Sequence, residues 1–198
     1  MAVRSAGHPV RGAERPEKFA RFALFAECLL TGVWITVAAL PLITLLPACA
    51  AGCAHLRRQL EGRRGGLREF TADLREAVRT GRRAALLWWV ALALLAFDWQ
   101  VARSGVLPGG RPLAAVSVLG LLALAVAALR VAAAWRPGTV DWAPLVRTAA
   151  RRTLTDPAGS LLLVGGFVAV ALTAWQVPPL AAPALGALAA AAVAVDRR

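Results

Sequence analysis

Residues 22–54 decide the fold, and they read FALFAECLLTGVWITVAALPLITLLPACAAGCA. Glu27 is the one charged side chain in this stretch. An α-helix rises about 1.5 Å per residue, so a single helix here would measure about 50 Å, well beyond a bilayer core of about 30 Å. Pro41 and Pro47 interrupt the stretch, and proline breaks or kinks a helix interior. The stretch therefore predicts two helices at membrane depth, joined at a proline-containing turn.

We expect the first helix of this hairpin over residues 22–40 and the second over residues 42–57. Pro41 begins the turn, and Pro47 lies near the start of the second helix, where proline is favoured. The hydroxyl of Thr44 can donate to carbonyl groups that the prolines leave unpaired. The apolar part of the second helix is short for a crossing. It therefore either spans with its arginines reaching the interface or re-enters the side from which it came.

Four further apolar segments have the length of a membrane-crossing helix. They are residues 84–102, 113–134, 158–175 and 177–195. With the hairpin, these segments predict an all-α, polytopic transmembrane helix bundle of about six crossings, in a single membrane domain over residues 22–198. The composition agrees, because 59% of the residues are hydrophobic and only 17% are charged. A soluble domain of this size needs more polar residues to cover its surface.

The basic residues are placed between the apolar runs, and they give the chain a net charge of +12. This placement follows the positive-inside rule and not the pattern of a nucleic-acid-binding face. With six crossings and the N-terminus inside, only Arg103 and Arg111 of the 23 Lys and Arg residues lie in an outer loop. We therefore expect both termini, including a basic tail over residues 1–21, to lie in the cytoplasm, and we expect no nucleic-acid partner.

Residues 67–83 have the pattern of an amphipathic helix on the cytoplasmic side. Apolar residues recur at three- and four-residue spacing, while arginines and acidic residues cover the remaining faces. The interaction surface that we expect on this helix consists of Leu67, Phe70, Leu74, Arg75 and Arg79. Such a helix can lie on the anionic lipid of the inner leaflet, dock a transporter or enzyme subunit, or serve only as a basic connector.

Ionisable side chains at membrane depth are unfavourable to bury, so each is a candidate for function. Glu27 lies in the first helix near the cytoplasmic side, and the returning helix brings His55 and Arg57 to a similar depth. A pair between Glu27 and either His55 or Arg57 would lower the penalty of burial. We favour a structural role, in which the pair pins the hairpin, over a proton or substrate relay.

Cys49, Cys53 and His55 share one short segment, but they do not form a recognisable metal site. The spacing Cys-x-x-x-Cys is not a standard zinc spacing and a fourth ligand is not evident, whereas free cysteine commonly packs as a small apolar side chain. The sequence pattern also offers no set of nucleophile, base and orienting group. We therefore expect no metal, no cofactor and no catalytic activity.

Residues 27–34, 40–48 and 67–70 resemble the YesL-like family of bacterial integral membrane proteins. That family has an apolar helix, a Pro-Val-Val-Thr-x-x-Pro-Ala turn and a basic cytoplasmic segment with an aromatic residue. The matching residues are Pro41, Thr44, Pro47, Ala48 and Phe70. Leu42 and Ile43 replace the two valines of the turn. The resemblance implies a multi-pass protein of the bacterial plasma membrane, associated with carbohydrate-uptake and polysaccharide-degradation systems and without an established activity.

These observations favour an accessory or scaffold protein whose cytoplasmic helix touches a transporter or enzyme subunit. The second hypothesis is a small secondary transporter with its site at the proline-broken hairpin, because broken helices form the substrate site in many transporters. The small number of polar groups at membrane depth argues against it. The third hypothesis, a permease subunit of an ATP-driven importer, rests on a loose likeness of residues 76–81 to a coupling loop.

Overall fold

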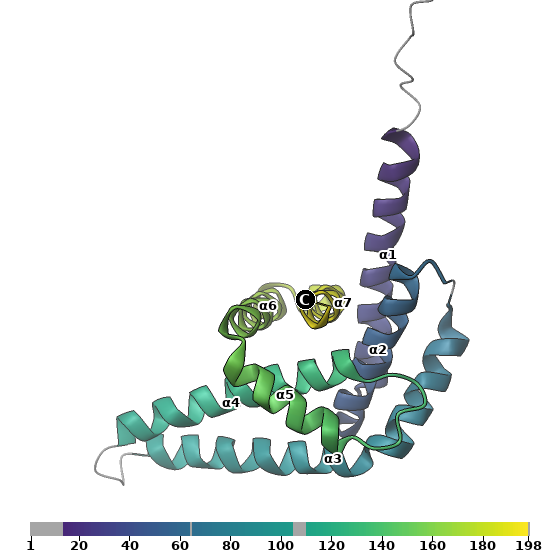
Figure 1. The fold of residues 1–198 in the computed structure, drawn as a ribbon. Coiled ribbons are helices and arrows are strands. Elements are labelled where there is room, and N and C mark those ends of the chain that lie inside the picture. Colours follow the sequence, from purple (N-terminus) through teal and green to yellow (C-terminus); the bar gives the residue numbers. More distant parts are fainter. Residues whose placement is uncertain (1–13, 64, 105–109, 198) are drawn as a thin grey trace, which may run out of the picture.

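The computed structural model describes residues 14–63, 65–104 and 110–197, and this described part is helical and contains no strand (Figure 1). The elements, in chain order, are α1 (Glu14–Ala38), the 3-10 helix η1 (Leu42–Thr44), α2 (Leu45–Leu60), α3 (Leu67–Arg103), α4 (Gly110–Ala134), α5 (Ala143–Thr155), α6 (Pro157–Gln176), the 3-10 helix η2 (Pro178–Leu180) and α7 (Ala181–Asp196). The predicted all-α class is confirmed for the described residues.

Among the described residues, α3, α4 and α6 are long and apolar enough to cross a membrane. Most of their apolar side chains point away from the rest of the molecule. Examples are Leu94, Phe97, Leu119, Leu161 and Leu172. Extended apolar surface of this kind marks a membrane protein, because in water it would have to be buried. The predicted count of about six crossings is not supported, since the apolar part of α1, Phe25–Ala38, and α7 are both shorter.

The helices run in several directions and do not share one axis. In Figure 1, α1 and α2 run up the view, α4 and the second half of α3 run across it, and α6 and α7 are seen nearly end-on. Neighbouring pairs are therefore antiparallel hairpins that cross one another at large angles. This arrangement differs from a bundle of parallel crossings, because the connections through η1, α5 and η2 redirect the chain between pairs.

The predicted cytoplasmic helix over residues 67–83 and the predicted crossing over residues 84–102 form one helix, α3. Arg82, Arg83 and Ala84 at the junction are good helix formers, and the helix continues there. Figure 1 shows the first half of α3 beside α2 and the second half beside α4, with a change of direction between them. Gly81 lies between the two halves, and the ring of Trp142 packs against it. The amphipathic first half and the apolar second half of α3 thus run in different directions and pack against different helices.

The start of the first helix also differs from expectation. Of the predicted basic tail over residues 1–21, residues 1–13 lie outside the described residues, and residues 14–21 belong to α1. Acidic and basic residues in this segment are compatible with helix, so the helix extends beyond its apolar part.

The core is centred on α2, which packs against α1, α3, α4 and α7. Its buried residues are mostly small, and they include Ala48, Ala50, Ala51, Gly52, Cys53 and Ala54. Small side chains let neighbouring helix backbones approach closely, which is how helices associate where no hydrophobic drive operates. The short second helix of the predicted hairpin is therefore the most enclosed element of the molecule.

A second close approach occurs where α1 crosses α7. Gly32 and Gly186 face each other there, and a Cβ atom added to Gly186 would collide with the backbone of Cys28 and Gly32. The contact at this crossing is between the two helix backbones, so no flexible side chain is present that could move aside to make room for a larger residue.

We expect Gly186→Ala to lower the free energy of unfolding by about 1–3 kcal/mol, the usual effect of overpacking a filled core. Gly165→Ala on α6 is the matched control, because no heavy atom lies within 4 Å of its added methyl group. Unfolding of the purified protein in detergent, followed by tryptophan fluorescence, measures both. Equal stabilities of the two variants would contradict the close crossing of α1 and α7.

Candidate functional site

The proline-broken hairpin is closed by its own hydrogen bonds. The hydroxyl of Thr44 donates to the carbonyl oxygens of Ala38 at 2.5 Å and Pro41 at 2.7 Å, the role that the sequence predicts for it. Helix α2 begins at Leu45, within the predicted segment 42–57, and Pro47 is buried in its first turn. These bonds occupy the carbonyls at the turn that a substrate would otherwise contact.

Contacts with α3 fix the depth of the hairpin tip. The indole N–H of Trp89 donates to the carbonyl oxygen of Leu42 at 3.0 Å. At the other end of α2, Arg58 forms an ion pair with the buried Asp73 of α3. Helix α2 therefore lies antiparallel to the first half of α3. It begins level with the start of the apolar half of α3 and ends level with Asp73.

Of the two pairs expected for Glu27, the structure contains the one with His55. A carboxylate oxygen of Glu27 lies 3.7 Å from Nε2 of His55, which is close but beyond hydrogen-bond distance. The His55 ring is fully buried and packs edge-on against the Trp34 ring, with centroids 5.1 Å apart. Neither ring nitrogen has a hydrogen-bond partner among the described residues. This contact joins α1 to α2, as a hairpin pin requires.

Arg57, the alternative partner that the sequence offers for Glu27, has other partners in the structure. Its guanidinium donates to the carbonyl oxygens of Ala133 and, at 3.2 Å, Trp135, and it lies 3.5 Å from a carboxylate oxygen of Asp196. Arg57 thus satisfies carbonyls at the C-terminal end of α4, where cations are favoured. It also joins that end to the last turn of α7. Asp196 was missed because only the fold brings it near α2.

The predicted interaction surface on residues 67–83 divides into an inner and an outer side. Phe70 is 2% exposed and its ring lies 5.5 Å from that of Trp34, so it is a packing residue and not a docking residue. Leu74 is half-buried against the core. Leu67, Arg75 and Arg79 are exposed, so the outer side is the one that carries positive charge.

The start of α3 is stabilised by Glu69. The backbone N–H of Gly66 donates to the Glu69 carboxylate at 2.8 Å, and this hydrogen bond lowers the pKa of that carboxyl below its ordinary value. A lowered pKa means that the stabilisation by this cap is fully present above the ordinary carboxyl pKa and is lost as the pH falls through the lowered pKa.

The cysteines belong to the packing of α2 and α1. Cys53 is buried, with its sulfur 3.9 Å from the carbonyl oxygen of Ala189, and Cys28 and Cys49 are half-buried free thiols. In the described ranges, no group of three or more His, Cys, Asp and Glu side chains is placed to hold a metal ion.

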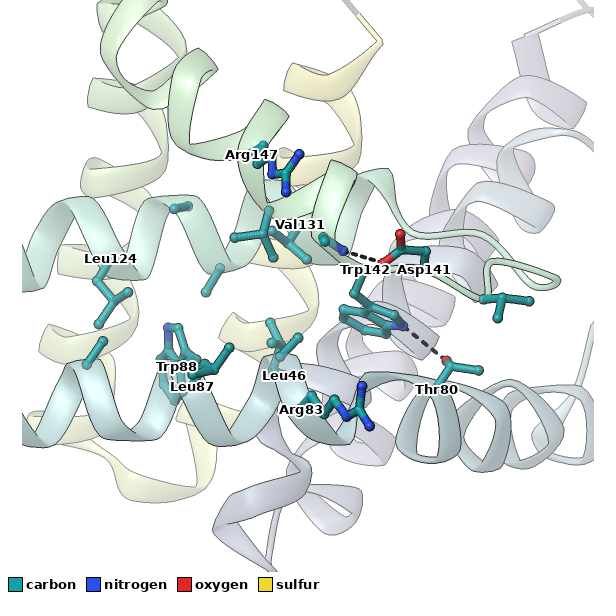
Figure 2. Close-up of a pocket in the computed structure, with 17 residues that line it drawn as sticks. Leu46, Thr80, Arg83, Leu87, Trp88, Leu124, Val131, Asp141, Trp142 and Arg147 are labelled. Carbon is teal, nitrogen blue, oxygen red and sulfur yellow. Dashed lines mark hydrogen bonds between the residues drawn. The ribbon is translucent and has the colours of Figure 1, made fainter.

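A cavity that the sequence does not predict lies between α3, α4 and α5 (Figure 2). Its volume is about 620 Å³, and its wall is largely apolar. Trp142 closes one side, and its indole N–H donates to the Thr80 hydroxyl at 3.0 Å. Arg83, Asp141 and Arg147 also line the cavity. Spacing along the chain gives no sign of it, because its lining comes from α3, α4, α5, Leu46 of α2 and the segment before α5.

Comparison of the chain with protein-family models, curated proteins and solved structures yields no match. The resemblance to the YesL-like family accordingly stays a prediction from the sequence.

We expect Arg57→Met to lower the free energy of unfolding by about 3 kcal/mol, because it leaves buried carbonyls without their charged donor and leaves Asp196 with Arg152 alone. Arg63→Met removes the same charge from an exposed pair with Glu61, and we expect a change below about 0.5 kcal/mol. Denaturant unfolding in detergent measures both. A small effect at Arg57 would show that its contacts with α4 and α7 contribute little.

Proposed function

We propose that the chain is an accessory or scaffold protein of the bacterial plasma membrane, without catalysis of its own. In this proposal the outer side of the first half of α3 binds a transporter or enzyme subunit of carbohydrate uptake or utilisation. The observation that carries the proposal is the exposed, arginine-bearing face of a helix whose other half is apolar enough to cross a membrane.

The inner side of this helix supports the proposal by holding the outer side in place. Phe70 packs on Trp34, and Asp73 pairs with Arg58 of α2. Arg75 and Arg79 project from the opposite side, and neither is hydrogen-bonded or ion-paired to any described residue. A rigid surface with unpaired positive charge suits an acidic partner surface, since complementary charge speeds and orients association.

The orientation that we propose places both termini and the arginine-rich segments in the cytoplasm. Besides the positive-inside rule, contacts at the C-terminal end of α7 support it. Asp196 lies 3.5 Å from Arg57 and 3.1 Å from Arg152, which the sequence assigns to two cytoplasmic segments. A count of six crossings with this sidedness requires the hairpin to span fully. The contact of Trp89 with Leu42 favours the re-entrant alternative, because it places the tip near the start of the apolar half of α3.

The alternative of a secondary transporter with its site at the hairpin has weaker support. Thr44 is engaged with its own turn, Pro47 is buried, and the Leu42 carbonyl accepts from Trp89. These groups are the ones that a broken-helix site would offer to a substrate.

The orientation is tested by single cysteines and a membrane-impermeant thiol reagent, in a background without Cys28, Cys49 and Cys53. We expect Ser104→Cys to react in intact cells and Pro137→Cys to react only after permeabilisation. Leu42→Cys should stay unlabelled from outside if the hairpin re-enters. Labelling of position 137 in intact cells would overturn the proposed sidedness. Labelling of position 42 in intact cells would show that the hairpin crosses the membrane fully.

The binding surface is tested by a photo-crosslinking residue placed in turn at Arg75, Arg79 and Phe70 in native membranes. We expect positions 75 and 79 to capture the same transporter or enzyme subunit, identified by mass spectrometry and by reciprocal capture. Position 70 should capture nothing from outside the chain, because its side chain is buried. Capture of lipid alone from positions 75 and 79 would contradict partner binding by this surface.

A further inference from the structure

The cavity between α3, α4 and α5 is separate from the surface on which the proposed function relies. Its volume of about 620 Å³ lies within the range of small-molecule sites, about 300–1,000 Å³. Leu87, Leu124 and Val131 contribute to an apolar wall, and Ala127 and Ala128 leave room beside them. This wall alone would suit any apolar ligand. The specificity for one class of ligand must therefore come from the residues at the rim of the cavity.

The rim carries unpaired positive charge. Arg83 from α3 and Arg147 from α5 are exposed, and neither is hydrogen-bonded or ion-paired to a described residue. Figure 2 shows them on opposite sides of the cavity. Asp141 is the acidic residue of the lining, and its carboxylate accepts from the backbone N–H of Ala143 at 2.9 Å, which caps the start of α5. Two guanidinium groups against one engaged carboxylate favour an anionic group.

A polar donor inside the cavity is left without a partner. The indole nitrogen of Trp88 is buried and has no hydrogen-bond partner in the described structure. Figure 2 shows this nitrogen turned toward the space between α3 and α4. A buried N–H without an acceptor is unfavourable, so a ligand that brings an acceptor to this depth would be stabilised.

We propose that the cavity is a binding site for an anionic glycerophospholipid. Its phosphate lies between Arg83 and Arg147, an ester carbonyl accepts from Trp88, and an acyl chain follows the apolar wall. The order of charge, acceptor and apolar surface in the cavity matches the order of groups in such a lipid. A soluble phosphate would use only the rim. Arg83 ends the arginine-rich half of α3, so the rim lies where a lipid headgroup would be.

The experiment is native mass spectrometry of the purified full chain in neutral detergent, titrated with phosphatidylglycerol or with phosphatidylcholine of the same acyl chains. We expect the first phosphatidylglycerol to bind at least about tenfold more tightly, because charge-assisted hydrogen bonds to phosphate are strong. The double variant Arg83→Gln, Arg147→Gln should lose this preference. The control variant Arg82→Gln, Arg151→Gln removes the same charge from exposed sites outside the cavity and should keep it.

Two further measurements distinguish binding of the whole lipid from binding of its phosphate group alone. Ala127→Leu narrows the apolar wall and should weaken phosphatidylglycerol binding while the fold and the charge are kept. Inorganic phosphate should not displace the lipid. Equal affinity for the two lipids, unchanged binding by the Arg83 and Arg147 variant, or displacement by inorganic phosphate would each overturn the proposal. This assay uses purified protein, so neither a cytoplasmic partner nor the orientation of the chain in a cell affects its result. The lipid proposal can therefore fail while the proposed function holds, and the reverse.

Discussion

The guanidinium of Arg57 is the interaction on which the arrangement of the helices most depends. A buried arginine without partners is strongly unfavourable, so the helix that carries it must be surrounded by acceptors. Here the acceptors come from the C-terminal end of α4 and from Asp196 at the end of α7. Because α2 is built largely of small residues, four helices can approach it closely enough for those acceptors to reach Arg57. The position of one charge thus couples elements that are far apart in the chain.

Helix α3 joins two environments that a membrane protein normally keeps in separate elements. Its first half presents an apolar and acidic side to α1 and α2 and a basic side outward. Its second half presents apolar side chains outward and packs on α4. The helix is continuous across the junction, although it changes direction there. A partner bound to the first half would therefore contact the same helix whose second half is apolar enough to cross a membrane.

The sequence was sufficient where local chemistry decides the outcome. Long apolar runs predicted the helical class, and Pro41 with Thr44 predicted a turn whose hydroxyl satisfies free carbonyls. The sequence was insufficient where the role of a side chain depends on which residue of another helix lies next to it. The amphipathic pattern of residues 67–83 shows that Phe70 faces away from water but not that Trp34 covers it. Likewise, a charge at Arg57 shows that a partner is needed, whereas the choice of Asp196 over Glu27 depends on how α7 packs.

The arginines also show why net charge alone does not define a function. The positive-inside rule treats them as equivalent, yet the structure sorts them into groups with different surroundings. Arg57, Arg58 and Arg130 are engaged inside the molecule with carbonyl or carboxylate groups. Arg75 and Arg79 lie on an outer helix face, and Arg83 and Arg147 lie at the cavity rim above an apolar wall. Only arginines without an internal partner retain their full attraction for another molecule, and the surface beneath each one then decides whether that molecule is a protein or a lipid.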